Sequence, residues 1–399
     1  MSEQIIHAFE AGRRGKPDEL DAGIAHLVGA YFLEQDPSTR FDLRVSGSYN
    51  LDLDQPVVKV SGEVSATTLA KENMYQEITD VILDHYNQTH RTELSREQFI
   101  VGYNFKPQMG ILATNDKAGD SGDPIAVAYK DGPLHLPWER YLAVELRDLV
   151  DGIYQLEGLV PPTLASRAEL KEVAGLRADG KISVQALYEK AHFRGIERIT
   201  FAVEHEANTP LEELRQEISR VVRAQLREWE TQYGQSLGNP KIIINGHGAW
   251  HQGGWKVDEG SREAKSYRDG FGSYGVMEDS FSGEDPTKPS GTGTFLARYI
   301  AVQIVANDLA DFARVALTYT IGQDEVGLNV TTQGTGKLPQ QELHQWVRKN
   351  IPLRINDGIE LFCLRNPRLY QEIVASSDFF HDPLFPWNEV KVKYTPKKP

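Results

Sequence analysis

The sequence has little cysteine and no long apolar run, and both absences narrow the class of protein. Cys363 is the only cysteine among 399 residues, so the chain contains no internal disulfide bond and no cysteine-rich zinc site. No apolar stretch approaches the ~20 residues that a transmembrane helix needs. The opening segment MSEQIIHAFEAGRRG lacks the apolar centre of a signal peptide. We therefore expect a cytoplasmic location and no membrane partner.

An excess of positive charge is also absent. The chain has 43 Lys and Arg against 57 Asp and Glu, which gives a formal net charge of −14 at pH 7. Nucleic-acid binding depends on a basic surface that neutralises the phosphate backbone. We therefore expect no nucleic-acid partner, although a local basic pocket on an acidic protein is still compatible with a small phosphorylated ligand.

The chain does contain several short segments in which Gly or Pro stands beside Asp and Lys. They are GKPDELDAGI near the N-terminus, KAGDSGD near residue 120, LRADGK near 180, VDEGSREAK near 260 and FSGEDPTK near 285. Turn residues bring backbone N–H groups close to a ligand, Asp holds divalent cations and Lys meets phosphate. Five such segments across 270 residues predict a polyphosphate–metal site that is assembled from distant loops.

The spacing of apolar residues favours an α+β fold. Helical periodicity predicts helices at 18–34, 73–87, 210–229 and 294–312, and alternation predicts strands at 57–64, 241–245, 315–321 and 327–332. Helices and strands mix without strict βαβ alternation, which argues against a doubly wound sheet. Residues 245–293 are rich in Gly, Ser, Asp and Lys, and structureless stretches of that length usually serve a ligand.

These segments, in this order, resemble the methionine adenosyltransferase (S-adenosylmethionine synthetase) family over most of the chain. AGDSGD resembles the family's G-A-G-D-Q-G, LRADGK its L-R-P-D-A-K, and INGHGAWHQGG its I-N-P-T-G-R-F-V-I-G-G. SFSGEDPTK resembles A-F-S-G-K-D-P-T-K, TYTIG resembles S-Y-A-I-G, and FPWNEVKVKY resembles the C-terminal F-P-W-E run. The resemblance implies an enzyme that transfers the adenosyl group of ATP to the sulfur of methionine and then cleaves the released triphosphate.

The resemblance also implies an architecture and partners. We expect three similar interleaved α+β domains with mixed, largely antiparallel sheets and helices on one face. Their expected limits are 1–14 with 131–236, 15–109 with 237–279, and 110–130 with 280–399. The family requires Mg²⁺, binds ATP and methionine, and forms homodimers or dimers of dimers with active sites between subunits, so the same is expected here.

The family's motifs assign roles to individual residues of this sequence. The expected catalytic residues are Lys16, Lys181, Lys265 and Lys288. The expected ATP contacts are Asp120, Asp179, Trp250, Asp258, Asp269, Phe271 and Ile321. Methionine is expected to contact Glu63 and Asp258, Asp18 is expected to bind Mg²⁺, and Arg44 falls where the family has a glutamate that helps to hold a monovalent cation. An arginine there implies that K⁺ is not required.

A structural alternative stands beside several of these roles. Asp18 would also serve as an ordinary helix N-cap, and Lys16, in place of the family's histidine, would also fit a solvated loop lysine. Asp120 and Asp179 lie in Asp-Gly-type turns. Trp250 fits either a stacking contact with adenine or a core position.

Departures from the family's motifs concentrate on the positions expected to hold triphosphate. The arginine of an R-K pair becomes Ala264, the first lysine of S-G-K-D becomes Glu284, and an aspartate and an arginine become Ser290 and Gly291. Nearby arginines are candidates to compensate; they are Arg13, Arg14, Arg262 and Arg268.

Three functional hypotheses follow from these departures. The first is a divergent methionine adenosyltransferase. The second is a homologue that binds ATP and Mg²⁺ but uses a different amino acid or nucleophile, since fold alone does not fix function. The third is a regulatory subunit of an active partner.

Overall fold

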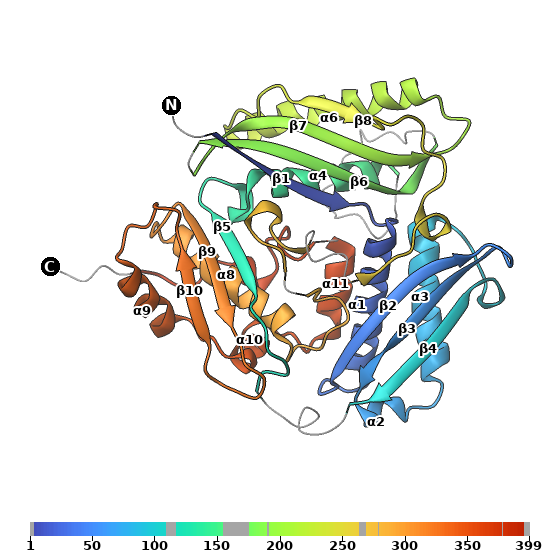
Figure 1. Cartoon of the computed structure of the whole chain (residues 1–399), viewed down its shortest axis with the longest axis horizontal. Coiled ribbons are helices and arrows are strands. Elements are labelled where there is room, and N and C mark those ends of the chain that lie inside the picture. The colour runs from blue at the N-terminus through green and yellow to red at the C-terminus, as the bar shows by residue number, and fades with distance from the viewer. Residues whose placement is uncertain are drawn as a thin grey trace.

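The fold consists of three β-sheets arranged around a central group of helices (Figure 1). The computed structural model describes residues 4–108, 117–154, 175–189, 191–262, 269–277, 279–376 and 378–394. Among the described helices none is long and apolar enough to cross a bilayer. The mixture of helices with largely antiparallel sheets confirms the predicted α+β class.

The first sheet contains the N-terminal strand and three later strands. In spatial order they are β1 (Gln4–Gly12), β6 (Leu176–Glu189), β7 (His192–His205) and β8 (Lys241–Ile244). The β1–β6 and β6–β7 pairs are antiparallel, whereas β7 and β8 run parallel. Strand β8 therefore lies in this sheet, although the expected limits assigned residues 237–279 to the second domain; the domain division itself stays a prediction.

The second and third sheets have three strands each. The second sheet has the order β2 (Phe41–Asn50), β3 (Gln55–Val64) and β4 (Ile100–Pro107). The third has the order β10 (Gly327–Thr331), β9 (Phe312–Thr318) and β5 (Ile125–Tyr129). Only the β3–β4 pair of these two sheets is parallel.

Several helices lie between the three sheets near the centre of the molecule, and others lie at its edge (Figure 1). The described α-helices are α1 (Pro17–Gln35), α2 (Ala66–Leu69), α3 (Met74–His90), α4 (Trp138–Ile153), α6 (Leu211–Tyr233), α8 (Thr294–Ala306), α9 (Gln340–Asn350), α10 (Ile355–Phe362) and α11 (Pro367–Ser376). Helix α4 packs on β1 and β6, α1 on β2, and α8 on β5 and β9. Helices α1 and α8 are buried on nearly every side, as expected of helices that are apolar all round.

Most elements expected from the sequence are present, with one clear correction. The expected helices 18–34, 73–87 and 210–229 correspond to α1, α3 and α6. The helix expected at 294–312 ends at Ala306, because Asp308 takes a left-handed backbone conformation with φ of 59° and β9 begins at Phe312. The strand expected at 315–321 accordingly lies three residues earlier.

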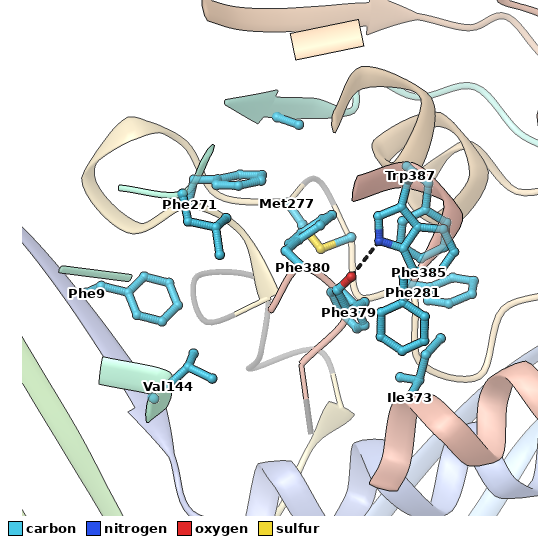
Figure 2. Packing of buried hydrophobic residues seen from close by; sticks show 14 of the residues in the cluster. Phe9, Val144, Phe271, Met277, Phe281, Ile373, Phe379, Phe380, Phe385 and Trp387 are labelled. Carbon is cyan, nitrogen blue, oxygen red and sulfur yellow. Dashed lines mark hydrogen bonds between the residues drawn. The ribbon is translucent and has the colours of Figure 1, made fainter. Parts of the chain in front are cut away.

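The C-terminal segment returns into the centre of the molecule and anchors the Gly-rich region from the sequence. Trp387 stacks on Phe295 with ring centroids 3.9 Å apart, and its indole N–H donates to the carbonyl of Phe379 at 2.5 Å. Figure 2 shows Trp387 and Phe379, joined by this hydrogen bond, beside Phe281 and Phe380. Phe281 is 1% exposed. This aromatic core therefore fixes the start of the segment that leads to Lys288.

Candidate active site

The N-terminus of α1 joins Lys16 and Asp18 to a distant loop. Lys16 is the N-cap residue, and no side chain caps the helix. One carboxylate oxygen of Asp18, Oδ2, accepts from Lys16 Nζ at 2.5 Å, and the other, Oδ1, accepts the N–H of Ser261 at 3.2 Å. Asp18 is therefore not the N-cap residue that the structural alternative required. Its carboxylate instead connects α1 to a loop 243 positions later.

Asp179 on β6 lies close to Lys16. Gly15 packs directly on Ala178, where an added Cβ would lie only 2.4 Å from the alanine side chain. The Asp179 carboxylate is buried and accepts the N–H of Gly254 at 2.7 Å. Burial raises the pKa of Asp179, while the Gly254 N–H and the nearby Lys16 charge oppose that rise. We call Lys16, Asp18, Asp179 and Ser261 the Asp18 cluster.

A second group of charges surrounds Lys288. Its Nζ donates to Asp120 Oδ2 at 2.8 Å and to Asp42 Oδ2 at 3.3 Å. The Lys288 side chain is only 8% exposed. Burial alone would lower the pKa of Lys288, but the hydrogen bond to Asp120 and the charge of Asp42 raise it above its ordinary value. Lys288 is therefore a permanent cation at the meeting point of two carboxylates from distant elements.

The loop of Asp120 is held by backbone pairing on both sides. Gly119 N–H donates to the carbonyl of Thr287 at 2.9 Å, and Gly122 exchanges backbone hydrogen bonds with Tyr319. The N–H of Ile321 donates to Ser121 Oγ at 3.0 Å. The structure thus brings Asp120, Lys288 and Ile321 together, as the sequence resemblance implied.

Glu284 lies against the same group with its charge buried. Its carboxylate accepts a hydrogen bond from Ser290 Oγ and lies 3.9 Å from the guanidinium of Arg262. Burial raises the pKa of Glu284 well above its ordinary value, and the charges of Asp42 and Asp279 raise it further. We call Asp42, Asp120, Glu284 and Lys288 the Lys288 cluster.

Arg44 pairs with carboxylates at the edge of the Lys288 cluster. Its Nη1 lies 2.6 Å from Asp42 Oδ1, and its Nη2 lies 3.9 Å from Asp279 Oδ2. The Arg44 side chain is 45% exposed. A cationic side chain therefore already lies beside these carboxylates, and the expectation that K⁺ is not required stays a prediction.

Two consecutive residues connect the two clusters. Ser261 donates to Asp18, and Arg262, the next residue, lies 3.4 Å from Asp42 Oδ1. Arg262 is fully buried and also donates to the carbonyls of Ser280 and Ser282 at 2.8 and 2.6 Å. The two clusters are therefore neighbouring parts of one charged site that is built from all five sequence segments.

Three residues expected in the site lie on exposed surface beside it. Lys181 pairs with Glu10 at 3.2 Å, with its side chain 48% exposed. Glu63 on β3 is exposed directly opposite Asp42 on β2. Asp258 is exposed on the loop between Gly254 and Ser261. These positions leave all three side chains accessible to a bound ligand.

Other expected residues have different surroundings. Trp250 is half-buried, so it is not a core tryptophan. Phe271 is 1% exposed, stacks on Phe380 and lies under the guanidinium of Arg140. Asp269 is buried and accepts from Ser280 Oγ at 3.2 Å. The burial of Phe271 and Asp269 argues against their expected contacts with ATP, while Lys265 lies outside the described residues.

Two of the arginines proposed to compensate for lost cations serve the fold instead. Arg13 is fully buried and binds Asp151 at 2.7 Å and the carbonyls of Arg177 and Asp179. Arg14 donates to the carbonyls of Val374 and Ala375 in α11. These guanidinium groups hold chain segments together, as Arg262 does, so they do not replace the missing phosphate contacts.

The carboxylates of the site fit a metal ion that binds together with a phosphate ligand. Within the described ranges, no group of three or more His, Cys, Asp or Glu side chains could hold a metal alone. Mg²⁺ in nucleotide sites commonly takes one or two carboxylates and completes its shell with phosphate oxygens and water. Asp18, whose side chain is 11% exposed, offers such a carboxylate beside Lys16.

Sequence reasoning missed two carboxylates of the site. Asp42 precedes Arg44 by two residues on β2 and so shares its face of the sheet. Glu204 ends β7 beside Asp179 and accepts the N–H of Gly253 at 2.9 Å. Alternation of Phe41, Leu43 and Val45 with polar residues was the available signal for Asp42, whereas Glu204 had no comparable signal.

A cleft of about 890 Å³ opens beside Glu204 in the described part of the chain. Residues from the hairpin of β2 and β3, the end of α3 and the first sheet line it. Gly253, Gly254 and Trp255 form the wall that it shares with the Asp18 cluster. The charged site is therefore open to solvent on this side.

Comparisons with known proteins found similarity to one group of enzymes. Residues 252–389 match the model of the S-adenosylmethionine synthetase C-terminal domain. The chain is also 26% identical to the S-adenosylmethionine synthase of Thermosynechococcus vestitus (strain NIES-2133 / IAM M-273 / BP-1), over 97% of this chain and 96% of that protein. The chain is therefore similar to S-adenosylmethionine synthetases, most specifically in its C-terminal part. The matched region of this synthetase-like chain includes Ser261, Glu284 and Lys288.

Proposed function

We propose that the protein transfers the adenosyl group of ATP to the sulfur of methionine, giving S-adenosylmethionine. The observation that carries the proposal is the convergence of the five Gly/Asp/Lys segments, in which Asp18 binds Ser261 and Lys288 binds Asp120. Similarity to S-adenosylmethionine synthetases supports a transferase-type enzyme. The proposal extends that family-level conclusion to a specific reaction and substrate.

The reaction proposed here forms one bond and breaks one. A lone pair on the methionine sulfur forms the S–C5′ bond, while the C5′–O5′ bond breaks and its electrons leave with triphosphate. Water then cleaves triphosphate to diphosphate and phosphate. The leaving group is highly charged, so the barrier falls when fixed cations face the developing charge.

Lys16 is the residue proposed to face the leaving oxygen. It lies between the carboxylates of Asp18 and Asp179, so the chain already holds its ammonium group in place. Lysine keeps its charge at neutral pH because its ordinary pKa is near 10.4. Lys16 would therefore stabilise the leaving group as a cation and would not act as a proton shuttle.

The remaining roles follow the positions of the side chains. Lys288 and Lys181 would bind phosphate oxygens, Asp120 would meet the nucleoside or the amino-acid ammonium group, and the exposed carboxylates of Glu63 and Asp258 would meet methionine. Asp18 would hold Mg²⁺, which would neutralise phosphate charge when bound. Glu284 stands where the family motif has a lysine, so the site lacks that cation, and ATP is expected to bind only as its magnesium complex.

A second candidate function rests on Glu284. Its buried carboxylate, close to Asp42 and Lys288, makes the region more acidic than the family motif would. Glu284 in place of the family's lysine favours a reaction in which a different nucleophile or a different amino acid takes the place of methionine. A homodimer with sites between subunits, as in the family, is proposed for either function.

Product analysis distinguishes these functions. The protein is incubated with ATP, MgCl₂ and methionine, and the products are measured by mass spectrometry. S-adenosylmethionine supports the proposal. ATP consumption without S-adenosylmethionine favours the second candidate and calls for a screen of amino acids and amines. An inactive protein that alters the kinetics of an active synthetase when mixed with it would instead be a regulatory subunit.

A further inference from the structure

Three consecutive residues at the end of β7 hold the loop 245–254. The first contact involves Val203, whose N–H donates to Asn245 Oδ1 at 2.8 Å and whose carbonyl accepts from Asn245 Nδ2 at 2.9 Å. The side-chain amide of Asn245 thus makes the two hydrogen bonds that the backbone of a neighbouring strand would make. Asn245 itself has a left-handed φ of 46°, so the chain leaves the sheet at this residue and enters the loop.

The second contact is made by His205, which is fully buried. Its N–H donates to the carbonyl of Trp250 at 2.9 Å, and its Nε2 accepts the N–H of Trp250 at 3.3 Å. Its Nδ1 lies 3.1 Å from the carbonyl of Glu206. This pattern assigns a neutral imidazole with the proton on Nδ1, because Nε2 must be free to accept. His205 therefore fixes the backbone of Trp250 from both sides.

The third contact is made by Glu204. Its Oε1 accepts the N–H of Gly253 at 2.9 Å, while Asp179 accepts the next N–H, that of Gly254, at 2.7 Å. Successive backbone N–H groups are thus held by two carboxylates on neighbouring strands. A Cβ on Gly253 would lie 2.7 Å from Asp179 and 2.8 Å from Glu204. Only glycine fits between these two side chains.

Placing the carboxylates of Asp179 and Glu204 side by side lowers the stability of the folded protein. This cost argues that the pair has a functional role. Asp179 and Glu204 are like charges on adjacent strands, and such neighbours destabilise a sheet. Both are more than 90% buried. Burial raises the pKa of Glu204, and the neighbouring Asp179 charge raises it further. Departures from local stability rules concentrate at functional sites.

We propose that Glu204 and His205 are positioning residues that preset the loop 245–254 for the nucleotide. This inference rests on the proposed function and on the expected stacking of Trp250 on adenine; the loop also borders the Asp18 cluster. His205 sets the backbone of Trp250, and Glu204 sets the Gly253–Gly254 turn. A loop that is held in its binding conformation before ATP arrives loses less conformational entropy on binding.

Hydrogen exchange of the nucleotide-free protein tests directly whether Glu204 and His205 hold the loop 245–254. We call these contacts the clamp. In Glu204→Ala and His205→Ala, exchange in the peptide 245–254 should become at least about tenfold faster, with the rest of the chain unchanged. Glu204→Gln should retain protection at Gly253, because the amide oxygen can still accept. Unchanged exchange in both alanine variants would overturn the clamp.

Steady-state kinetics then test the link to the nucleotide. The KM for ATP should rise about tenfold in Glu204→Ala and His205→Ala, while the KM for methionine changes less than twofold. Two exposed residues of β7 provide matched controls, Glu197→Gln and His192→Ala, whose KM values should equal those of the wild type. Faster loop exchange with an unchanged KM for ATP would overturn the positioning role.

The two measurements also separate this inference from the proposed function. A wild-type protein that turns over no ATP contradicts the proposed function, and the exchange result then decides the clamp on its own. If the alanine variants do not fold, Glu204→Met, which removes the acceptor, and His205→Gln give the same comparison with smaller changes in packing. A KM for ATP that stays at the wild-type value in folded His205→Gln, together with unchanged loop exchange, would overturn the role of His205.

Discussion

Lys288 donates a hydrogen bond to Asp120 at 2.8 Å, although 168 positions separate the two residues in the sequence. Gly119 and Thr287 pair through their backbones beside this bond. The ion pair therefore depends on two loops that only the folded chain brings together. It joins the two sequence segments that most resemble the family's phosphate and nucleoside motifs, and it makes Lys288 the most direct target for mutation.

Replacing Lys288 by methionine should lower kcat/KM by at least about a hundredfold, the usual cost of losing one charged group that stabilises a transition state. Methionine retains the length and apolar stem of the side chain. Lys337→Met, at an exposed lysine paired with Asp308, is the matched control and should retain full activity. Activity of Lys288→Met within twofold of the wild type would show that Lys288 only holds the Asp120 loop.

Asp18→Asn should reduce magnesium-dependent turnover by orders of magnitude with little loss of stability. The physical reason is that Lys16, and not Asp18, is the N-cap residue of α1, so loss of the Asp18 charge costs the helix only the ~0.3–1 kcal/mol that an acidic residue in its first turn contributes. Turnover is measured across a magnesium titration and compared with the melting temperature. Asp52→Asn, in the exposed turn between β2 and β3, is the control. An unfolded variant whose remaining native fraction is fully active would show that Asp18 is structural.

Removal of K⁺ at fixed ionic strength should change the rate less than twofold. Arg44 already pairs with Asp42 at 2.6 Å, so a guanidinium supplies the positive charge there. The measurement compares KCl with tetramethylammonium chloride. In Arg44→Met, K⁺ should increase the rate, because Asp42 and Asp279 lose their cation. A tenfold or larger fall in the wild-type rate without K⁺ would contradict this assignment.

Glu284→Gln should stabilise the protein at neutral pH. The folded-state pKa of Glu284 is raised well above the ordinary 4.5, first by burial and then by Asp42 and Asp279. The folded protein therefore holds the proton more tightly than the unfolded chain. As pH rises above about 4.5, Glu284 ionises more readily in the unfolded chain than in the folded protein, so the free energy of unfolding falls. This loss disappears as pH falls towards about 4.5.

Melting temperatures measured from pH 8 to pH 4.5 check the sign of this effect. The Glu284→Gln variant should melt at least about 2 °C above the wild type at pH 7, and the difference should shrink as pH falls. Glu342→Gln, at an exposed position of α9, should follow the wild type throughout. A variant that is less stable at pH 7 would mean that the ionised carboxylate stabilises Arg262 and Ser290.

The sequence predicted the helices well because apolar spacing determines which face of a helix is buried. Helices α1 and α3 start and end within a few residues of their expected limits. Helix α8 ended early because the left-handed conformation of Asp308 leaves no mark on apolar periodicity. Local patterns thus predicted the elements, whereas single backbone conformations decided some of their ends.

The site could be predicted only in part. Residues carried by matched motifs, such as Asp120 and Lys288, do meet. Asp42 was missed because β2 was not predicted, and Glu204 because its role depends on Gly253, 49 positions away. Phe271 lies in a matched segment, yet its ring belongs to the aromatic core. Tertiary packing decides such cases, because two side chains with the same motif context can face opposite sides of one loop.

The central claim is adenosyl transfer, and its most direct test is the stoichiometry of the products. ATP, methionine and MgCl₂ are incubated with the wild type and with Lys288→Met, and mass spectrometry quantifies S-adenosylmethionine beside the phosphate products. We predict one S-adenosylmethionine, one diphosphate and one phosphate for each ATP consumed, with Lys288→Met far slower. ATP consumption without S-adenosylmethionine, or no consumption by a correctly folded protein, would contradict the account.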